Sequence, residues 1–168
     1  ASPHKWMFAP AGCGFLYGRG EGLDRLAGNL HLGSAEGQAA DRLMQTGTAS
    51  GALFDGYAAA LDFFLRLDPE AIFARQRQLR DLVMARANAL PGAFLFTPAE
   101  ADRSAAMVAF RIDDVDMRSL NDRFQAAGIR VAPGRGVRLS VHVHTRQTDI
   151  ERFFDVLGRS LKDWGRKG

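Results

Sequence analysis

The sequence predicts an α/β protein whose strands are covered by helices. Apolar residues recur at helical spacing over residues 53–65 and 72–83, and again between residues 150 and 164. By contrast, residues 93–96 and 106–112 are short apolar runs close to Pro, Gly, Ser and Asp, which is typical of strands. Because helices and strands mix in the second half of the chain, we expect that half to fold as a compact α/β unit.

The first half of the chain is expected to contain little sheet. Residues 14–17 are interpreted as a short buried strand between glycines. Residues 18–52 are rich in Gly, Ala and Ser and show no sustained period, so we interpret them as mostly loop, with some helical turns around residues 35–44. A helix over residues 53–65 follows.

Residues with capping chemistry mark the expected helix ends. Asp68 is expected to cap the second helix, which carries the apolar residues at 72–83, with Pro69 at its first position. The pair Asp113–Asp114 is expected to cap a helix that stops at Gly128. Thr145 is expected to cap the last helix.

Two more strands are expected at residues 129–132 and 137–144, joined by a Pro- and Gly-containing turn at residues 133–136. The second helix is expected to end at Pro91–Gly92, where the pattern changes from helices to strands. This change places a domain boundary near residues 86–92.

Composition narrows the function classes. The apolar runs are shorter than the roughly 18 residues of a membrane span, so no membrane association is expected. The single cysteine, Cys13, excludes an intrachain disulfide and fits a reducing, cytoplasmic location. The 22 Lys and Arg residues barely outnumber the 19 Asp and Glu residues and are mixed with them, so no nucleic-acid partner is expected. The basic tail of Lys162, Arg166 and Lys167 is interpreted as helix C-terminal cations, with a polyanion site as the alternative.

Two other patterns are interpreted as structural. His142 and His144 share one face of an expected strand, a spacing that can bind zinc, but no further ligand follows at a telling distance. We therefore expect no metal. Residues 18–22 resemble a phosphate loop but lack the Gly-Lys-Ser/Thr ending.

Lys5 is the leading candidate for chemistry. A lysine that reacts with a carbonyl compound must be held in place and must lose its proton readily. Ser2, His4 and backbone amides are groups of the kind that hold a phosphate beside such a lysine. By spacing alone, Ser-x-His-Lys is more often a surface turn than a reactive site.

The residues around Lys5 resemble a known family. Residues 2–17, Ser-Pro-His-Lys-Trp-Met-Phe-Ala-Pro-Ala-Gly-Cys-Gly-Phe-Leu-Tyr, are similar to the lysine segment of class V aminotransferase-like pyridoxal-phosphate enzymes, which include isopenicillin N epimerase-like proteins and cysteine desulfurases. Residues 45–48 resemble the family's Gly-Thr element and residues 56–64 the helix after it. Residues 137–140 and 145–153 resemble its C-terminal strand and helix.

The resemblance implies a role for each matched residue. Lys5 would form the Schiff base with pyridoxal phosphate and transfer a proton at the substrate α-carbon, and Ser2 and His4 would contact the cofactor phosphate. Thr48 would reach the phosphate of the neighbouring subunit's cofactor, which requires a homodimer with shared active sites. Arg138 would bind the carboxylate of an amino-acid substrate, since a guanidinium makes two parallel hydrogen bonds to a carboxylate. Taken alone, Arg138 would be interpreted as a surface arginine on a strand, and Thr48 as a hydroxyl in a turn.

The resemblance also implies how the chain is organised. Residues 1–88 would be the C-terminal segment of the large cofactor-binding domain with its linking helices. Residues 89–168 would be the small C-terminal α/β domain, with a short, mainly antiparallel sheet. In the family, the acidic partner of the cofactor's ring nitrogen and the group that stacks on the ring lie before the lysine. We therefore expect a C-terminal part of a longer enzyme that is inactive alone and does not hold the cofactor tightly.

One departure from the family favours some reactions over others. Desulfurases carry a nucleophilic cysteine on a C-terminal-domain loop, whereas residues 133–136 contain none. Cys13 is expected to be a small packed residue. An epimerase, aminotransferase or lyase type of reaction is therefore preferred. The alternative is a catalytically incomplete fragment or pseudoenzyme that serves dimerisation or partner binding.

Overall fold

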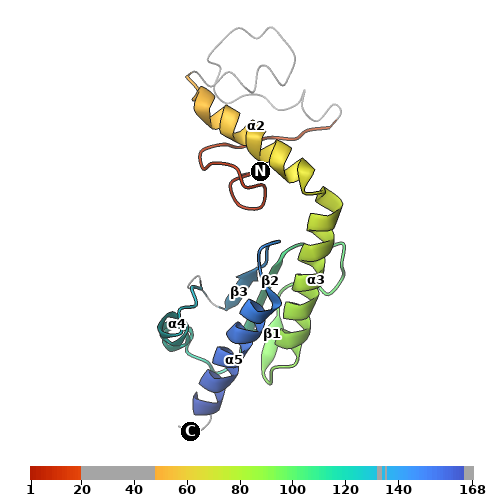
Figure 1. Ribbon diagram of the computed structural model, residues 1–168. Helices are drawn as coiled ribbons and strands as arrows, with labels where there is room; N and C mark the ends of the chain where they lie inside the picture. Colours follow the sequence, from red (N-terminus) through yellow and green to blue (C-terminus); the bar gives the residue numbers. More distant parts are fainter. Residues whose placement is uncertain (20–47, 132–133, 135, 165–168) are drawn as a thin grey trace. The chain divides into compact units, whose positions relative to one another are not determined.

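The computed structural model describes residues 1–19, 48–131, 134 and 136–164 (Figure 1). The chain divides into two compact units, Ala1–Leu67 and Asp68–Gly168, called here the first and second units. The helical turns expected around residues 35–44 lie outside the described residues, as does most of the expected loop. No helix in the described ranges is both long enough and apolar enough to cross a membrane.

The first unit contains the expected helix, α2 (Gly51–Arg66), with Ala60 and Phe64 buried. The expected strand at residues 14–17 is wrong: no strand forms there, and the side chains of residues 15–17 are exposed. A strand requires a neighbour that continues the hydrogen-bond ladder. Within the described residues, the backbone of this stretch pairs only where Ala1 and Phe15 exchange N–H···O bonds.

The second unit begins with α3 (Pro69–Asn88), whose predicted N-terminus is confirmed. The Asp68 carboxylate accepts a hydrogen bond from the Glu70 N–H at 3.1 Å, and Pro69 holds the first helical position. The helix ends at Asn88, three residues before Pro91. It packs against the strands of the second unit, so its contacts group it with the residues that follow it. The division of the family fold at residues 88 and 89 stays a prediction.

Three antiparallel strands form the sheet in the order β1 (Ala93–Leu95), β2 (Met107–Ile112) and β3 (Val137–Ser140). In the register, Phe94 faces Arg111 and Ala109 faces Arg138. Figure 1 shows α3 and the last helix beside these strands. The expected α/β unit with a short antiparallel sheet is confirmed.

Two strand predictions need correction. Residues 129–131 form no strand because the Ile129 N–H bonds back to the Phe124 carbonyl at 2.8 Å, closing the preceding helix, whose turn at Gly128 has φ 70°. The strand expected over residues 137–144 ends at Ser140. The His142 N–H donates to the Thr145 hydroxyl at 2.9 Å, and the Thr145 N–H donates to the His142 carbonyl, so the backbone turns there.

The cap of α4 (Met117–Ala126) is Asp116 and not the predicted Asp113–Asp114. Its two carboxylate oxygens accept from the N–H groups of Arg118 and Ser119 at 3.1 and 3.2 Å. Asp114 has a left-handed φ of 58°, so it lies in the turn before the helix. The predicted stop at Gly128 is confirmed, since the helix ends at Ala126.

The Asp116 cap gives a pH-dependent prediction. Hydrogen bonds from the Ser119 hydroxyl, then from the backbone N–H groups of Arg118 and Ser119, lower the pKa of Asp116 below its ordinary value of 3.8. A pKa lower in the folded state than in the unfolded state stabilises the fold above the unfolded-state pKa, and this stabilisation disappears as the pH falls through the folded-state pKa. We expect Asp116→Ala to lower the urea midpoint near pH 7, with a difference from the unmodified chain that shrinks below about pH 4. Asp116→Asn is the matched control, because the amide caps without titrating; an unchanged difference at acid pH would contradict the assignment.

The last helix, α5 (Gln147–Trp164), closes the core. The predicted Thr145 cap is wrong, since the helix starts two residues later and the Thr145 hydroxyl serves the turn before it. The predicted apolar stripe is confirmed over most of its length, since Ile150, Phe153, Phe154 and Leu157 are buried, whereas Leu161 is half-buried. The Phe154 ring stacks on Phe110 of β2 at 6.3 Å, and the Phe153 ring on Phe124 of α4 at 4.7 Å.

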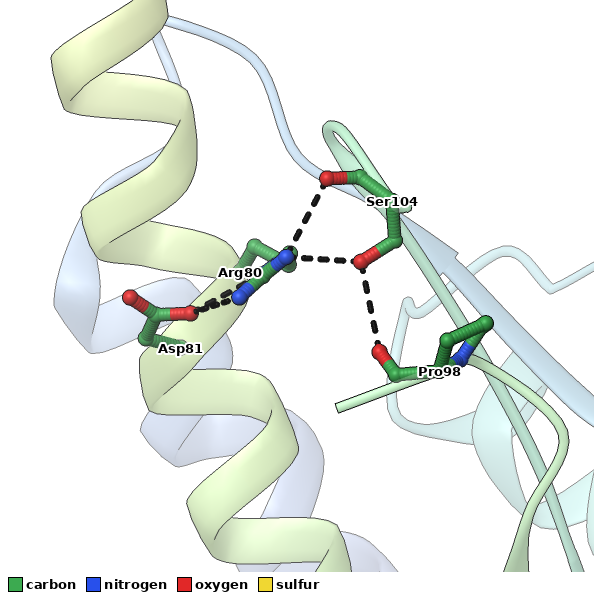
Figure 2. Close-up of polar contacts among 4 residues, drawn as sticks. All are labelled: Arg80, Asp81, Pro98 and Ser104. Carbon is green, nitrogen blue, oxygen red and sulfur yellow. Dashed lines mark hydrogen bonds and ion pairs between the residues drawn. The ribbon is translucent and has the colours of Figure 1, made fainter. Parts of the chain in front are cut away.

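A buried arginine interrupts the apolar face of α3 (Figure 2). Only 4% of the Arg80 side chain is exposed. Its guanidinium donates to the Ser104 carbonyl and hydroxyl at 3.1 and 2.6 Å, and twice to the Asp81 carboxylate at 2.8 and 2.6 Å. The Ser104 hydroxyl donates in turn to the Pro98 carbonyl at 3.4 Å. Arg80 therefore ties the connection between β1 and β2 to α3.

Candidate active site

The lysine turn, residues 1–9, is a compact turn at the start of the first unit. Pro3 is buried, and its carbonyl accepts hydrogen bonds from the N–H groups of Met7 and Ala9 at 3.2 and 3.4 Å. Ser2, His4 and Lys5 flank this buried proline and are all exposed. The backbone bonds thus fold the turn over Pro3 and leave the three candidate side chains on its surface.

Aromatic contacts seat this turn on α2. The Phe8 ring meets Phe63 edge-on at 5.4 Å, and the Phe15 ring stacks on Tyr57 at 6.5 Å. Phe63 and Tyr57 are six residues apart on α2, so these contacts hold the segment at two points along the helix. Phe8 has a left-handed φ of 60°, which is uncommon for a bulky residue and is held by this packing.

Small residues allow the backbone to approach α2 closely. A Cβ at Gly56 would meet the Pro10 ring at 3.1 Å, and one at Gly12 would meet Leu53 at 3.3 Å. The Cys13 thiol donates to the Leu53 carbonyl at 3.3 Å and is half-buried, so it packs on the helix. The segment that carries Lys5 is therefore fixed on a helix that the sequence predicted separately.

The three side chains at this turn have the chemistry that a phosphorylated carbonyl compound requires. A hydroxyl and an imidazole can bond phosphate oxygens, and an amine can react with a carbonyl carbon. Within the described ranges, no hydrogen bond or ion pair engages the side chains of Ser2, His4 or Lys5. This donor set fits pyridoxal phosphate. Residues 1–19 contain no Asp or Glu, so they supply no acidic partner for its ring nitrogen.

The other two predicted site residues lie elsewhere. Thr48 is exposed and precedes the start of α2 by three residues. Arg138 belongs to the second unit, where it is exposed on β3 opposite Ala109. No ion pair is formed by Arg138 with any described residue.

The two histidines take structural positions. His142 is buried, its Nδ1 accepts from the Val143 N–H at 2.8 Å, and its ring stacks on His144 at 4.7 Å. Over the part of the chain that is described, no three His, Cys, Asp or Glu side chains gather as a metal site would require.

Sequence reasoning missed two aromatic residues that lie on the same face of the sheet as Arg138. Phe94 and Phe96 are half-exposed and pack edge-on at 5.4 Å on the strand region across from Arg111 and Ala109. Strands at residues 93–96 and 106–112 were predicted from the sequence, but the register that groups these residues was not.

Comparison with known protein families shows to which family this chain belongs. Residues 1–153 match the family described as Aminotransferase class-V. This chain is a class V aminotransferase family member. It is 33% identical to isopenicillin N epimerase of Streptomyces clavuligerus over 179 residues, which cover 93% of this chain and 45% of that protein. The chain therefore spans less than half the length of this relative.

Solved structures of other proteins share the fold. A cysteine desulfurase from Escherichia coli matches with a TM-score of 0.75 at 22% identity, over 96% of this chain and 45% of that one. A mutant of C-DES, with glycine covalently linked to its pyridoxal-phosphate cofactor, matches with a TM-score of 0.57 at 19% identity, over 71% of this chain and 31% of that chain. The fold predicted from the resemblance is thus confirmed.

Proposed function

We propose that this chain is the C-terminal part of a pyridoxal-phosphate enzyme that acts at the α-carbon of an amino acid, in an aminotransferase, epimerase or lyase type of reaction. The observation that carries the proposal is the lysine turn, where exposed Ser2, His4 and Lys5 lie side by side on a segment fixed to α2. The family match supports it. The longer protein is called the whole enzyme below.

Each residue has a distinct task in this proposal. Lys5 binds the cofactor covalently through its Nζ atom and then holds the proton removed from the substrate Cα. Ser2 and His4 bind the cofactor phosphate, and Thr48 binds the phosphate held by a second subunit. Arg138 orients the substrate through its carboxylate. The cofactor supplies an electron sink for the charge that develops at Cα.

A cysteine desulfurase reaction fits this chain less well. The chain has one cysteine, and its thiol is engaged with the Leu53 carbonyl in the first unit. The second unit contains no cysteine that could accept sulfur. Epimerase, aminotransferase and lyase reactions require no protein cysteine that accepts sulfur, which favours these three types.

Trapping the cofactor tests the proposal directly. Borohydride reduction of the whole enzyme with pyridoxal phosphate is expected to leave the label on the peptide that contains Lys5. The chain offers two internal controls, Lys162 and Lys167, which occur near its C-terminus. A label on either control peptide, or none on the Lys5 peptide, would overturn the assignment.

A second candidate function follows from the surface of α2. Phe54 and Leu65 on this helix, and Leu67 just after it, are exposed apolar residues, which suit a surface covered by another polypeptide. On this alternative the chain serves dimerisation or partner binding without catalysis. A dimer whose Lys5 peptide stays unlabelled would favour it over the enzyme.

A further inference from the structure

On one face of the sheet, called here the open face, every side chain is at least partly exposed. Alternation along the strands divides the side chains between two faces. Val108, Phe110, Ile112 and Val137 are buried on the helix side. The open face comprises the residues of opposite parity: Phe94, Phe96, Met107, Ala109, Arg111, Arg138 and Ser140.

Arg138 faces an aromatic wall across this surface. Ala109 lies between the two, since it is opposite Arg138 in the register and its carbonyl accepts from the Phe96 N–H at 2.9 Å. Two strand spacings separate Phe96 from Arg138, which is about 10 Å between their backbones. The Ala109 side chain that lies between them is a single methyl group.

The wall opposite Arg138 consists of two aromatic rings in contact. The rings of Phe94 and Phe96 pack edge-on at 5.4 Å with 52% and 53% of each residue exposed. The Arg111 guanidinium lies 5.1 Å from the centre of the Phe94 ring and braces it from the next strand. An apolar group placed on these rings would remove their exposed surface from water, which is favourable.

The charges of this surface select the ligand further. The open face has two arginines and no acidic residue. Arg111 already pairs with Asp113 at 3.6 Å and with the Phe94 ring. Arg138 has no such pair among the described residues. A ligand with one carboxylate therefore suits this face, whereas a cationic side chain would meet two like charges.

We propose that the substrate is an amino acid with a large apolar side chain, whose carboxylate binds Arg138 while its side chain packs on Phe96 and Phe94. The proposal rests on the function proposed above, because that function makes Arg138 the carboxylate-binding residue. It adds a substrate class, and it makes Phe96 the residue that determines it.

Exchange of the substrate α-proton in D2O tests the substrate class in the whole enzyme with pyridoxal phosphate. We expect kcat/KM to be highest for phenylalanine or leucine and lower for alanine, glutamate and lysine. Phe96→Ala is expected to lower kcat/KM for phenylalanine by about tenfold or more, because one apolar contact in a pocket is worth roughly 10- to 200-fold. For alanine the same change is expected to have an effect within about twofold. Phe73→Ala, an equal truncation of a half-exposed phenylalanine on α3, is the matched control and is expected to leave both rates unchanged.

Calorimetry with unreactive ligands gives a second readout. We expect 3-phenylpropionate to bind the whole enzyme, and 3-phenylpropionamide and phenethylamine to bind at least about tenfold more weakly, since they lack the carboxylate. Phe96→Ala and Arg138→Gln are each expected to weaken the binding of 3-phenylpropionate. Arg138→Lys is expected to restore little of it, because an ammonium group cannot make the paired hydrogen bonds.

Failure of this inference is distinguishable from failure of the proposed function. A labelled Lys5 with exchange that is fastest for alanine or glutamate, or a Phe96→Ala variant that slows all substrates equally, would overturn the substrate class alone. The second result would mean that another part of the protein covers Phe96. An unlabelled Lys5 with no exchange for any amino acid would overturn the function first.

Discussion

Replacement of Lys5 by alanine is expected to slow α-proton exchange in the whole enzyme by about a thousandfold or more. A positioned acid–base group contributes typically 10²- to 10⁴-fold, and here the same amine also binds the cofactor. The exposed turn around Lys5 is held by backbone hydrogen bonds that the Pro3 carbonyl accepts, so the loss of one exposed side chain leaves the fold unchanged. Exchange rates by NMR and the circular dichroism of the variant measure the two effects separately.

Two further measurements separate catalysis from structure at this position. Lys162→Ala, which removes an exposed lysine from α5, is the matched control and is expected to exchange at the unmodified rate. Addition of a small primary amine is expected to restore part of the exchange to Lys5→Ala, because free amine can carry the proton in place of Nζ. A Lys5→Ala variant with undiminished exchange would refute the catalytic role.

The fold was predictable wherever one short stretch of sequence holds the deciding information. The cap of α3 depends on Asp68 and Pro69 at its own start, and the apolar stripe of α5 is periodic within the helix. The strand expected at residues 14–17 failed for the opposite reason. Its apolar residues satisfy the local pattern, but a strand exists only with a partner, and the pattern does not specify one.

Two helix and strand ends were mispredicted because a backbone N–H group had more than one possible hydrogen-bond partner. The Ile129 N–H can join a strand or close α4, and Gly128 at positive φ directs it to the helix. Three aspartates lie within four residues before α4, and each could cap it. Asp116 is the cap because its carboxylate reaches two N–H groups of the first turn.

The candidate site also has a part that was predictable from a short stretch of sequence and a part that was not. Ser2, His4 and Lys5 are neighbours in the sequence, so their grouping was predictable before any fold was known. The grouping of Phe96, Ala109 and Arg138 depends on the register of three strands that are far apart in the sequence. Such a register is set by packing of the whole sheet, which no local pattern encodes.

Among the charged residues of the second unit, Arg80 is the one whose removal is expected to lower the free energy of unfolding most. Arg80→Ala removes four hydrogen bonds and leaves the Ser104 carbonyl without its buried donor. Breaking a buried charged network by removing one partner costs about 3–5 kcal/mol. Because Asp81 is 61% exposed and water can solvate it again, we expect a loss near the lower end, about 3 kcal/mol. Urea unfolding of the chain measures this change.

Variants at matched positions identify the cause of this loss. Arg77→Ala truncates an exposed arginine one turn earlier on α3 and is expected to change the unfolding free energy by less than about 0.5 kcal/mol. Arg80→Met keeps the apolar stem and is expected to lose less than Arg80→Ala, because only the hydrogen bonds disappear. Ser104→Ala removes one acceptor of Arg80, so its effect combined with Arg80→Ala is expected to be smaller than the sum of the two single effects. Additive effects would show that Arg80 stabilises α3 without holding the connection between β1 and β2, contrary to the contacts in Figure 2.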